Sequence, residues 1–512
     1  MEHKLFMKRS KNFNYLPFCI LAAGFFTGCS DYKGASEPLS FAPSTAASLW
    51  IPPSCICKTQ QTLDELTVDQ LKDKSLSLAE VIDIALQNNP ATKITWAKAR
   101  FAAANYGQSL KDYFVLADFT SDYMNYQEAL FTSSNTSNVI TNVNNTDEST
   151  NFSSGNTFHG VSYGAQAQLS YTVLDFGQTR ASSKAALAAL YEADFLHNNE
   201  LQKTVNTTMN DYYLYLAQKS KVVASEQNVK NAEIALDAVN QRFMSGLADV
   251  SDKVQATTKL LEEKLALIQE KKLLTYSYTH LLNSMGFPAN AYLTFENYPE
   301  KIELVDIIDL SALIEIASSK RQDLQAAYQS VAVTQQKLKS AQAQRYPKVN
   351  ASFEIGRERA NLGIGSYGDY MLSLNLNFPL FHGFFIENGI KKAKADTEQA
   401  QAKLHQIQLA VVQEITNTFH DVSYAKDSYL YSKQYLESAM EDFRVNLEQY
   451  KAGLTTIVDL INAQTAVANA KAKLIEAQKG WYSSIANLSY STGTLTGGVD
   501  AISHQSSGVC NL

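Results

Sequence analysis

The chain has 512 residues, 45% of them hydrophobic and 19% charged, so it is apolar enough to bury a large core and is not a disordered charged tail. Its 44 basic and 51 acidic residues give a formal charge of −7 without any cluster of Lys and Arg, which excludes nucleic acid as a partner. Beyond the N-terminal region no stretch approaches the roughly 18 consecutive apolar residues of a membrane-spanning helix, which excludes a helical membrane protein.

The N-terminal region has the features of a secretion signal. Basic residues precede a short apolar stretch, residues 15–26, and Cys29 follows a small glycine. This arrangement resembles the bacterial lipobox, in which the cysteine becomes the lipidated first residue. We therefore predict a signal peptide at residues 1–28 and a lipidated leader at residues 29–75. The alternative is an ordinary cleaved signal with Cys29 merely near it.

The rest of the chain contains two copies of one pattern. Residues 77–85 and 309–317 open the two copies with similar sequences, and residues 89–91 then correspond to residues 321–323, which aligns Asn89 with Arg321. Residues 243–247 match residues 450–454. A repeat of about two hundred residues indicates a duplicated structural unit and not a small solenoid module. The predicted boundaries are residues 76–300 for the first repeat, 301–493 for the second and 494–512 for a C-terminal tail.

Four segments are predicted to be strands because apolar and polar residues alternate in them. Between residues 372 and 380, leucine or phenylalanine alternates with serine, asparagine or proline. Behind a secretion signal this alternation indicates transmembrane strands with lipid on one face and water on the other, although a half-buried sheet packed on helices would give the same pattern. The predicted strands lie near residues 113–126, 158–175, 347–358 and 366–381. Between the first two, residues 131–158 are rich in Asn, Ser and Thr and predict a surface loop.

The segments after the strands are predicted to be very long helices. No proline occurs between Ala91 and Phe287 or between Leu380 and Leu512, and proline is the residue that breaks helix interiors. We predict long helix pairs at residues 178–285 and 385–490, each pair reversing at a turn that contains glycine. The first helix of each pair, about 67 residues, would be about 100 Å long. Its apolar residues recur in steps of three and four, which is typical of a coiled coil.

Catalytic motifs occur only in the wrong context. Residues 160–164 fit G-x-S-x-G and residues 363–368 fit G-x-G-x-x-G, but neither lies between a strand and a helix, where the chemistry needs it. The eight histidines form no close ligand pair, and Cys55 and Cys57 have no third ligand nearby. The sequence therefore predicts no enzyme, no metal site and no cofactor.

The strand-to-helix junctions at residues 174–177 and 379–383, together with the Gly-Leu helix tips, resemble the outer-membrane efflux protein family of TolC-like channels, and in particular its lipidated OprM- and CusC-like branch. The resemblance covers residues 76–493. It implies an α+β fold in which a homotrimer, with four strands per subunit, closes a twelve-stranded transmembrane β-barrel that a long α-helical coiled-coil tunnel continues through the periplasm. Four strands cannot close alone, because the smallest such barrels have eight and an open edge is not tolerated in lipid.

The same resemblance implies the function. The protein would be the lipid-anchored outer-membrane channel of a tripartite efflux system, a passive exit duct for drugs or metal ions. Its partners would be a periplasmic adaptor (membrane fusion) protein and an inner-membrane transporter of the resistance-nodulation-division type. Two alternatives stay open: an exit duct for type I protein secretion, and a cell-envelope coiled-coil lipoprotein with no transport function.

The resemblance also implies a gate at the periplasmic tips. Asp459 falls where an inward-facing acidic ring narrows the pore, and Asn462 falls where a second acidic ring often sits. The alternative for Asp459 is a solvated helix residue. Tyr450 matches the pattern around the closed aperture, and Asp252 at the first tip matches an acidic partner of the gate network. Thr455 replaces a basic residue of that network, so the sequence predicts no salt bridge at this position.

The turns at the two tips are the predicted docking points for the adaptor. Each lies where one long helix reverses into another, so that glycine supplies backbone freedom and leucine an exposed apolar side chain. The predicted docking residues are Gly246 and Leu247 at the first tip and Gly453 and Leu454 at the second.

Overall fold

The computed structural model describes residues 36–50, 75–130, 156–298, 302, 309–360 and 366–495. Cys29, the predicted signal peptide and nearly all of the predicted loop at residues 131–158 lie outside the described residues. The chain divides into two compact units. One unit contains residues 107–184 and 336–394, and the other contains residues 37–106, 185–335 and 395 onward, so each unit is built from both sequence repeats.

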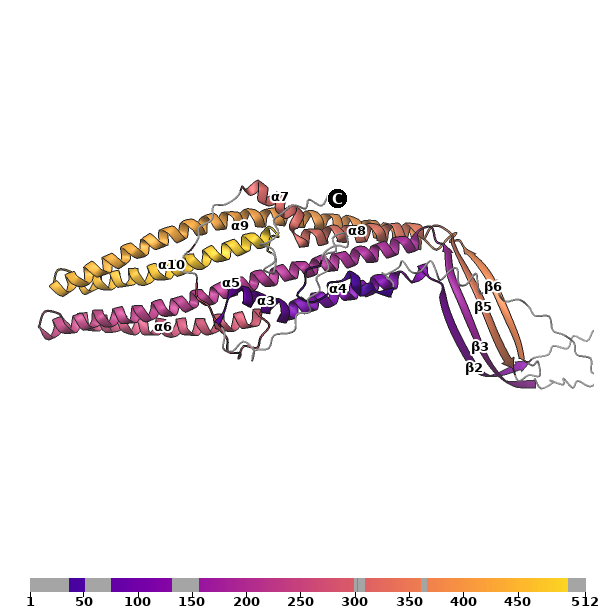
Figure 1. Cartoon of the computed structure of the whole chain (residues 1–512), viewed down its shortest axis with the longest axis horizontal. Coiled ribbons are helices and arrows are strands. Elements are labelled where there is room, and N and C mark those ends of the chain that lie inside the picture. Colours follow the sequence, from indigo (N-terminus) through magenta and orange to yellow (C-terminus); the bar gives the residue numbers. More distant parts are fainter. Residues whose placement is uncertain are drawn as a thin grey trace, which may run out of the picture. The chain divides into compact units, whose positions relative to one another are not determined.

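The first unit contains a four-stranded antiparallel sheet in the order β2-β3-β5-β6 (Figure 1). Each repeat contributes one hairpin, and the pairing of β3 with β5 joins them into one sheet. The register of this central pair is regular except for a bulge between Thr172 and Leu174. The strands are β2 (Leu116–Leu130), β3 (Asn156–Leu174), β5 (Lys348–Ala360) and β6 (Ser366–Asn377).

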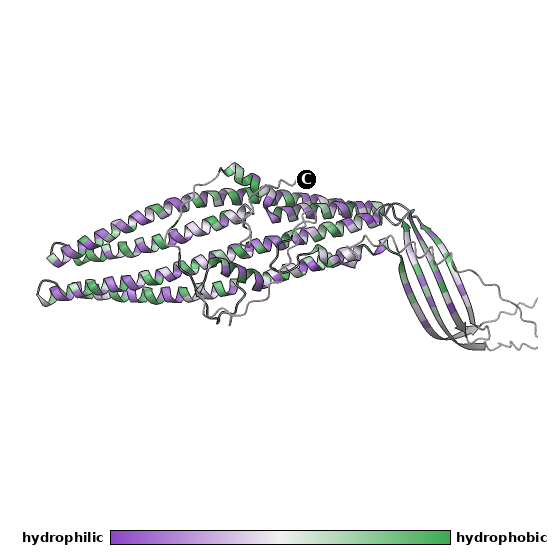
Figure 2. Cartoon of the chain, viewed as in Figure 1, coloured by the Kyte–Doolittle hydropathy of each residue, from purple (hydrophilic) through white to green (hydrophobic). Residues whose placement is uncertain are grey.

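The two faces of the sheet differ in polarity, as the alternation predicts. On one face Phe119, Ala167, Ile355 and Tyr370 lie directly opposite one another across the four strands. Phe119 and Tyr370 are 74% and 78% exposed in the single chain. The neighbouring row, on the other face, is Asp118, Gln168, Glu354 and Met371. Figure 2 shows the resulting mixture of hydrophobic and hydrophilic residues along the strands. A sheet with an exposed apolar face needs an apolar environment or partner.

Two strand ends differ from the predicted limits. The alternating pattern continues to Leu380, but β6 ends at Asn377 because Pro379 has no N–H group to donate to a strand ladder. At the other end, residues Lys111–Tyr113 form a 3₁₀ turn, and β2 begins only at Leu116. The alternation of apolar and polar residues indicates which face of the sheet a side chain occupies. It does not indicate whether the backbone is hydrogen-bonded to a neighbouring strand.

A tight junction connects β3 to the helix that follows it. The carboxylate of Asp175 accepts hydrogen bonds from the backbone N–H groups of Gly177 at 3.0 Å and Thr179 at 2.6 Å. Phe176 and Gly177 both have positive φ, 52° and 87°. The corresponding junction of the second repeat also has two consecutive residues at positive φ, Gly383 and Phe384. Asp175 therefore satisfies the first free N–H groups of the long helix, which need an acceptor.

The helices follow the same order in both repeats. In the first they are α3 (Leu78–Asn88), α4 (Pro90–Ser109), α5 (Gln178–Met244) and α6 (Val250–Ser284). In the second they are α7 (Leu310–Lys320), α8 (Gln322–Ala343), α9 (Phe385–Ala452) and α10 (Ile457–Ser491). α5 and α9 have 67 and 68 residues. Among the described residues, no helix combines the length and the apolar character that crossing a membrane requires.

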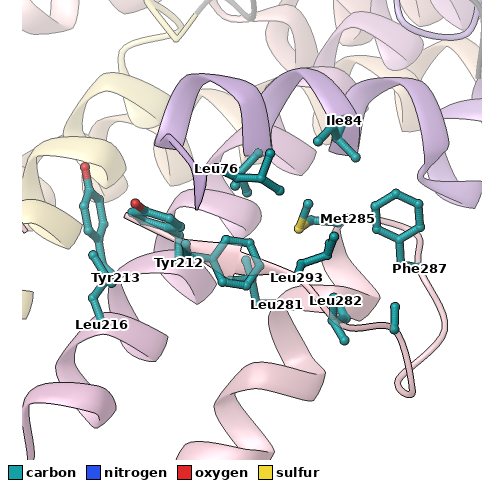
Figure 3. Close-up of a cluster of buried hydrophobic side chains, with 13 residues drawn as sticks. Leu76, Ile84, Tyr212, Tyr213, Leu216, Leu281, Leu282, Met285, Phe287 and Leu293 are labelled. Carbon is teal, nitrogen blue, oxygen red and sulfur yellow. The ribbon is translucent and has the colours of Figure 1, made fainter. Parts of the chain in front are cut away.

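Among the described residues, the largest hydrophobic cluster lies in the helical unit, where α3, α5 and α6 meet (Figure 3). Two short parallel strands, β1 (Ser75–Leu76) and β4 (Thr294–Phe295), bring the ends of the first repeat together beside it. Leu281, Leu282 and Met285 at the end of α6 are fully buried in this cluster. Each such side chain contributes about 1.5–3 kcal/mol by leaving water, so the cluster is a principal anchor of the first repeat.

A polar contact at the start of each repeat shows that the duplication is structural. Asn89, between α3 and α4, donates from Nδ2 to the carbonyl of Ser284 at 2.9 Å, near the end of α6. The equivalent residue Arg321, between α7 and α8, donates from Nη1 to the carbonyl of Ser491 at 3.0 Å, at the end of α10. Arg321 also pairs with Glu414 of α9 at 2.6 Å. In both repeats a side chain at the first helix junction therefore caps the last helix.

A glycine completes each of these junctions. Gly286 follows α6 and Gly493 follows α10, with φ of 79° and 70°. A Cβ atom on Gly286 would lie 2.6 Å from the carbonyl oxygen of Asn88, and one on Gly493 would lie 2.9 Å from that of Lys320. Glycine is needed at both positions because the backbone is left-handed and a neighbouring backbone approaches closely.

Candidate functional site at the hairpin tips

The α5–α6 and α9–α10 turns end their first helices in the same way. At the first tip the N–H of Leu247 donates to the carbonyl of Arg242 at 2.8 Å, and Gly246 has φ of 71°. At the second tip the N–H of Leu454 donates to the carbonyl of Gln449 at 2.8 Å, and Gly453 has φ of 81°. Both are Schellman motifs, which satisfy the free carbonyls of a helix end by means of a left-handed glycine.

The returning helices begin with different caps. Asp249 caps α6 by accepting a hydrogen bond from the N–H of Val250 at 2.6 Å. Thr456 caps α10 in a capping box, in which its side chain accepts from the N–H of Asp459 and the Asp459 carboxylate accepts from the N–H of Thr456 at 3.2 Å. The second tip therefore has a reciprocal pair of hydrogen bonds that the first tip does not have.

One hydrophobic cluster joins the helices just behind the tips. It contains the fully buried Val239 of α5, Ala256 of α6, Tyr450 of α9 and Leu460 of α10. Because each of the four long helices contributes a side chain, the two hairpins are packed together at this level. The cluster gives the tips a defined arrangement within one chain.

Arg242 is a polar link between the two hairpins at the level of the tips. Its guanidinium group donates to the backbone carbonyl of Tyr450, and also to the carbonyl of Leu247 at 3.1 Å. The group lies over the Tyr450 ring, 4.7 Å from the centroid. Arg242 thus places a positive charge at the C-terminal ends of both α5 and α9, where the helix dipoles favour a cation.

The structure places the predicted gate residues in different environments. Tyr450 is buried against Arg242, and burial followed by the nearby Asp252 carboxylate raises the pKa of the Tyr450 phenol. Asp252 itself is half-exposed on the first turn of α6, while Asn462 is exposed on α10. Tyr450 and Asp252 are therefore brought close together, with Arg242 as their third member.

Asp459 and Thr455 are also brought together. The Thr455 hydroxyl donates to the Asp459 carboxylate at 3.0 Å, and the Thr456 hydroxyl donates to the same oxygen at 2.6 Å. The hydrogen bonds from Thr456, and then the one from Thr455, lower the pKa of Asp459, which is exposed in the single chain. In one chain this carboxylate is thus the cap of α10. Whether it also belongs to a threefold ring stays a prediction, and repulsion within such a ring would move its pKa in the opposite direction.

The predicted docking residues lie at the outermost part of each turn. Leu247 is 68% exposed and Leu454 is 78% exposed, although both are large apolar side chains. Nothing within 4 Å would contact a Cβ atom on Gly246, whereas one on Gly453 would touch the Arg242 guanidinium at 3.6 Å. The tips therefore present two exposed leucines on backbone turns that hydrogen bonds hold in place.

Sequence reasoning missed Arg242. The match between the two repeats begins at Phe243 and Tyr450, so Arg242 lies one residue before it, opposite Gln449. The sequence did contain a signal for it. Thr455 stands where the gate network has a basic residue, so the acidic and aromatic residues of the tips need a cation from another position. Arg242 supplies it from the first hairpin.

The other motifs noted in the sequence do not lie in the structural context that their chemistry would need. Ser162, the centre of the G-x-S-x-G pattern, lies within β3 and opposite Met124 of β2, away from any strand-to-helix turn. In the part of the chain that the structure describes, no group of three or more His, Cys, Asp or Glu side chains could hold a metal ion. Cys55 and Cys57 lie outside that part.

The amino-acid sequence is similar to those of known proteins. The sequence matches the model of the family described as outer membrane efflux protein over residues 81–286 and 313–494, one segment in each repeat. Protein CyaE of Bordetella pertussis is 23% identical over 407 residues, which cover 79% of this chain and 80% of that protein. Outer membrane protein TolC of Salmonella enteritidis is 24% identical over 352 residues, covering 65% of this chain and 69% of that protein.

Solved structures share the fold. The CmeC outer membrane channel of Campylobacter jejuni superposes with a TM-score of 0.71 at 16% identity, covering 86% of this chain and 90% of that one. The outer membrane protein VceC of Vibrio cholerae gives 0.68 at 18% identity, covering 81% and 96%. With the family match extending over both repeats, the chain belongs to the outer membrane efflux protein family.

Proposed function

We propose that this protein is the outer-membrane channel of a tripartite efflux system, a passive exit duct for small molecules such as drugs or metal ions. The observation that carries the proposal is the family match over both repeats, which coincides with the two hairpins of long helices and the two strand pairs. Energy for transport would come from an inner-membrane transporter, of the resistance-nodulation-division type, acting through a periplasmic adaptor protein.

The working unit is a homotrimer. β2 and β6 are the edge strands of the described sheet, each hydrogen-bonded on one side only. Unpaired strand edges are not tolerated in lipid, so the edge of one copy must pair with the edge of the next. Three copies with four strands each close a twelve-stranded barrel, with residues such as Phe119 and Tyr370 facing lipid. Resistance of a trimer to urea extraction from outer membranes tests this, and extraction as monomers would contradict it.

The exposed tips dock the adaptor. Leu247 and Leu454 would insert between the helices of an adaptor hairpin, since isolated large apolar side chains at a rigid turn are suited to contact another protein. Replacing both with Asp should abolish efflux while trimer formation and surface level stay unchanged. Drug and metal susceptibility of a deletion strain carrying each variant is the measurement. The matched control places Asp at Ser245 and Ala452, which are exposed in the same turns and keep both leucines.

Normal resistance in the double Leu→Asp variant would refute the docking proposal without affecting the channel. Loss of efflux in both the variant and the control would mean that charge at the tips, and not loss of leucine, is responsible. If the deletion strain has the same susceptibility profile as its parent for all drugs and metal ions, the efflux proposal itself fails. The alternatives are then a protein-secretion duct or a lipoprotein without a transport role.

Asp459 forms the acidic constriction of the periplasmic entrance. Three carboxylates around one axis would favour cations and bind a multivalent cation as a plug. In planar bilayers the wild-type channel should be blocked from the periplasmic side by a trivalent cation. Asp459→Asn keeps an acceptor for the α10 cap and removes the charge, so it should lose most of the block. Unchanged block would place the charge elsewhere, with Asp252 the next residue to test.

Cys29 carries the lipid anchor. The support is the lipobox-like sequence at the end of the N-terminal apolar stretch. Radioactive palmitate should label wild type and not Cys29→Ala, whereas Cys19→Ala should label like wild type. Equal labelling of wild type and Cys29→Ala would leave an ordinary cleaved signal as the explanation.

A further inference from the structure

Residues 37–50, here called the strap, lie against α4 and α5 in the helical unit. The backbone of Trp50 forms two hydrogen bonds with the Asn198 side chain, from its N–H to Oδ1 at 2.8 Å and from Nδ2 to its carbonyl at 2.9 Å. Its ring packs against Tyr191 and Phe195 with centroids 5.3 Å away in each case. Trp96 of α4 donates from Nε1 to the carbonyl of Pro43 at 2.9 Å. The strap is therefore held by specific contacts along its length.

Asp194 lies on the face of α5 that the strap and α4 cover. Leu190, one turn earlier, packs with Ala42 of the strap and Ala99 of α4. His197, one turn later, pairs through Nδ1 with the Thr95 hydroxyl of α4 at 2.9 Å and through Nε2 with the strap carbonyl of Ser48 at 3.3 Å. Residues three and four apart share a helix face, so the Asp194 side chain points into the same covered layer.

The Asp194 carboxyl group is buried without a hydrogen bond. The residue is 0% exposed, and among the described residues neither of its carboxyl oxygens has a hydrogen-bond partner. An ionised carboxylate in such a place costs far more than the neutral acid, because no group replaces the lost water.

We propose that the strap is held on α5 more tightly when Asp194 is protonated than when it is ionised, so that residues 37–50 form a latch that loosens as pH rises. Burial raises the pKa of Asp194 to about 8, from 3.8, and lowers the pKa of His197 to about 4, from 6.5. Both groups are thus neutral in the closed latch near pH 7. Opening exposes them to water and restores their ordinary values.

Among the described residues, no charged group is resolved as a cause of the Asp194 shift. The titratable groups beside it on α5 are the Tyr191 phenol and the His197 imidazole. On the strap and the adjacent part of α4, the charged side chains of Glu37, Lys98 and Arg100 are exposed, and that of Lys93 is half-buried. Burial is accordingly the only resolved cause of the Asp194 shift.

The two shifts act on the latch with opposite signs. Between about pH 4 and 8 the closed latch holds one proton more than the open state at Asp194, so closure weakens as pH rises. Between about pH 4 and 6.5 it holds one proton fewer at His197, so closure strengthens as pH rises. The effects cancel below pH 6.5. Above it only the Asp194 effect remains, and the opening constant should increase about tenfold between pH 6.5 and pH 9.

Hydrogen exchange of the full-length protein in detergent tests the latch. The Trp50 amide, which donates to Asn198, reports opening once its rate is corrected for intrinsic exchange. In wild type its protection should fall about tenfold between pH 6.5 and pH 9, and in Asp194→Asn it should stay constant. Asp237→Asn, an exposed position on the same helix, is the matched control and should behave like wild type. Constant protection in wild type, or an unchanged fall in Asp194→Asn, would overturn the proposal.

A second measurement covers the case in which Asp194→Asn does not fold. Infrared spectroscopy of wild type at pH 7 should show the carbonyl stretch of a protonated carboxylic acid, and this band should disappear as the pH passes about 8. Absence of the band at pH 7 would show that Asp194 is ionised when buried, and the latch would have no basis.

Discussion

The glycine at the end of α10 provides a test in which the structure itself supplies the control. Gly493 and Gly246 have nearly the same φ, 70° and 71°, and both end a helix with the same motif. They differ in what surrounds them. A Cβ atom on Gly493 would lie 2.9 Å from the carbonyl carbon and oxygen of Lys320, whereas one on Gly246 would meet nothing within 4 Å.

Alanine at the two positions should therefore have unequal effects. The left-handed conformation costs a non-glycine residue about 1–2 kcal/mol at either site. At Gly493 the backbone at Lys320 must also move, and overpacking of this kind adds about 1–3 kcal/mol. Gly493→Ala should lower the free energy of unfolding by about 2–5 kcal/mol and Gly246→Ala by about 1–2 kcal/mol.

Urea unfolding of the purified protein in detergent, followed by far-ultraviolet circular dichroism, measures both variants. Gly286→Ala should lose about as much stability as Gly493→Ala, because its Cβ atom would lie 2.6 Å from the Asn88 carbonyl oxygen. Equal losses of stability in Gly493→Ala and Gly246→Ala would refute the reasoning. Equal losses would mean that the close approach of the Lys320 backbone adds nothing to the free-energy cost of alanine beyond the cost of the left-handed conformation.

Three further predictions concern charged groups. Arg242→Gln should weaken the contact between the two hairpins by about 1.5–3 kcal/mol, the range for a charged hydrogen bond. Hydrogen exchange of the backbone around Tyr450 should become faster. Arg242→Lys keeps the positive charge and should retain part of the contact. Arg321→Met should cost about 3 kcal/mol in urea unfolding because it leaves the Glu414 carboxylate without its cation; no loss would show that the pair is only an exposed contact. In a single chain, the cap that Asp459 provides should persist above pH 3.8 and be lost as pH falls below that value, since a lowered carboxyl pKa adds stability only while the group is ionised. Hydrogen exchange of the first turn of α10 measures it, and loss of protection already above pH 3.8 in the trimer is the result expected from repulsion within the ring.

Local patterns in the sequence determined most of the elements. Periodicity and the absence of proline predicted helices that begin at Gln178 and Phe385 and run for nearly seventy residues, as α5 and α9 do. Strict alternation predicted the two faces of the sheet. The capping of the last helix by Asn89 and Arg321 is different, because those contacts span 195 and 170 residues and only the tertiary structure shows them. The features read from periodicity and alternation are local. Such features depend on neighbours within one or two turns, which the sequence displays directly.

The tertiary structure alone decided the contacts between distant segments. Arg242 and Tyr450 are 208 residues apart, and Trp50 and Asn198 are 148 apart. The pairing of β3 with β5, the cation that joins the tips and the burial of Asp194 all arise where such segments meet. No periodicity marks them, because each depends on the packing of whole helices and strands and not on the preference of a local stretch of chain. An aspartate on a long polar helix looks solvated until the strap and α4 cover it.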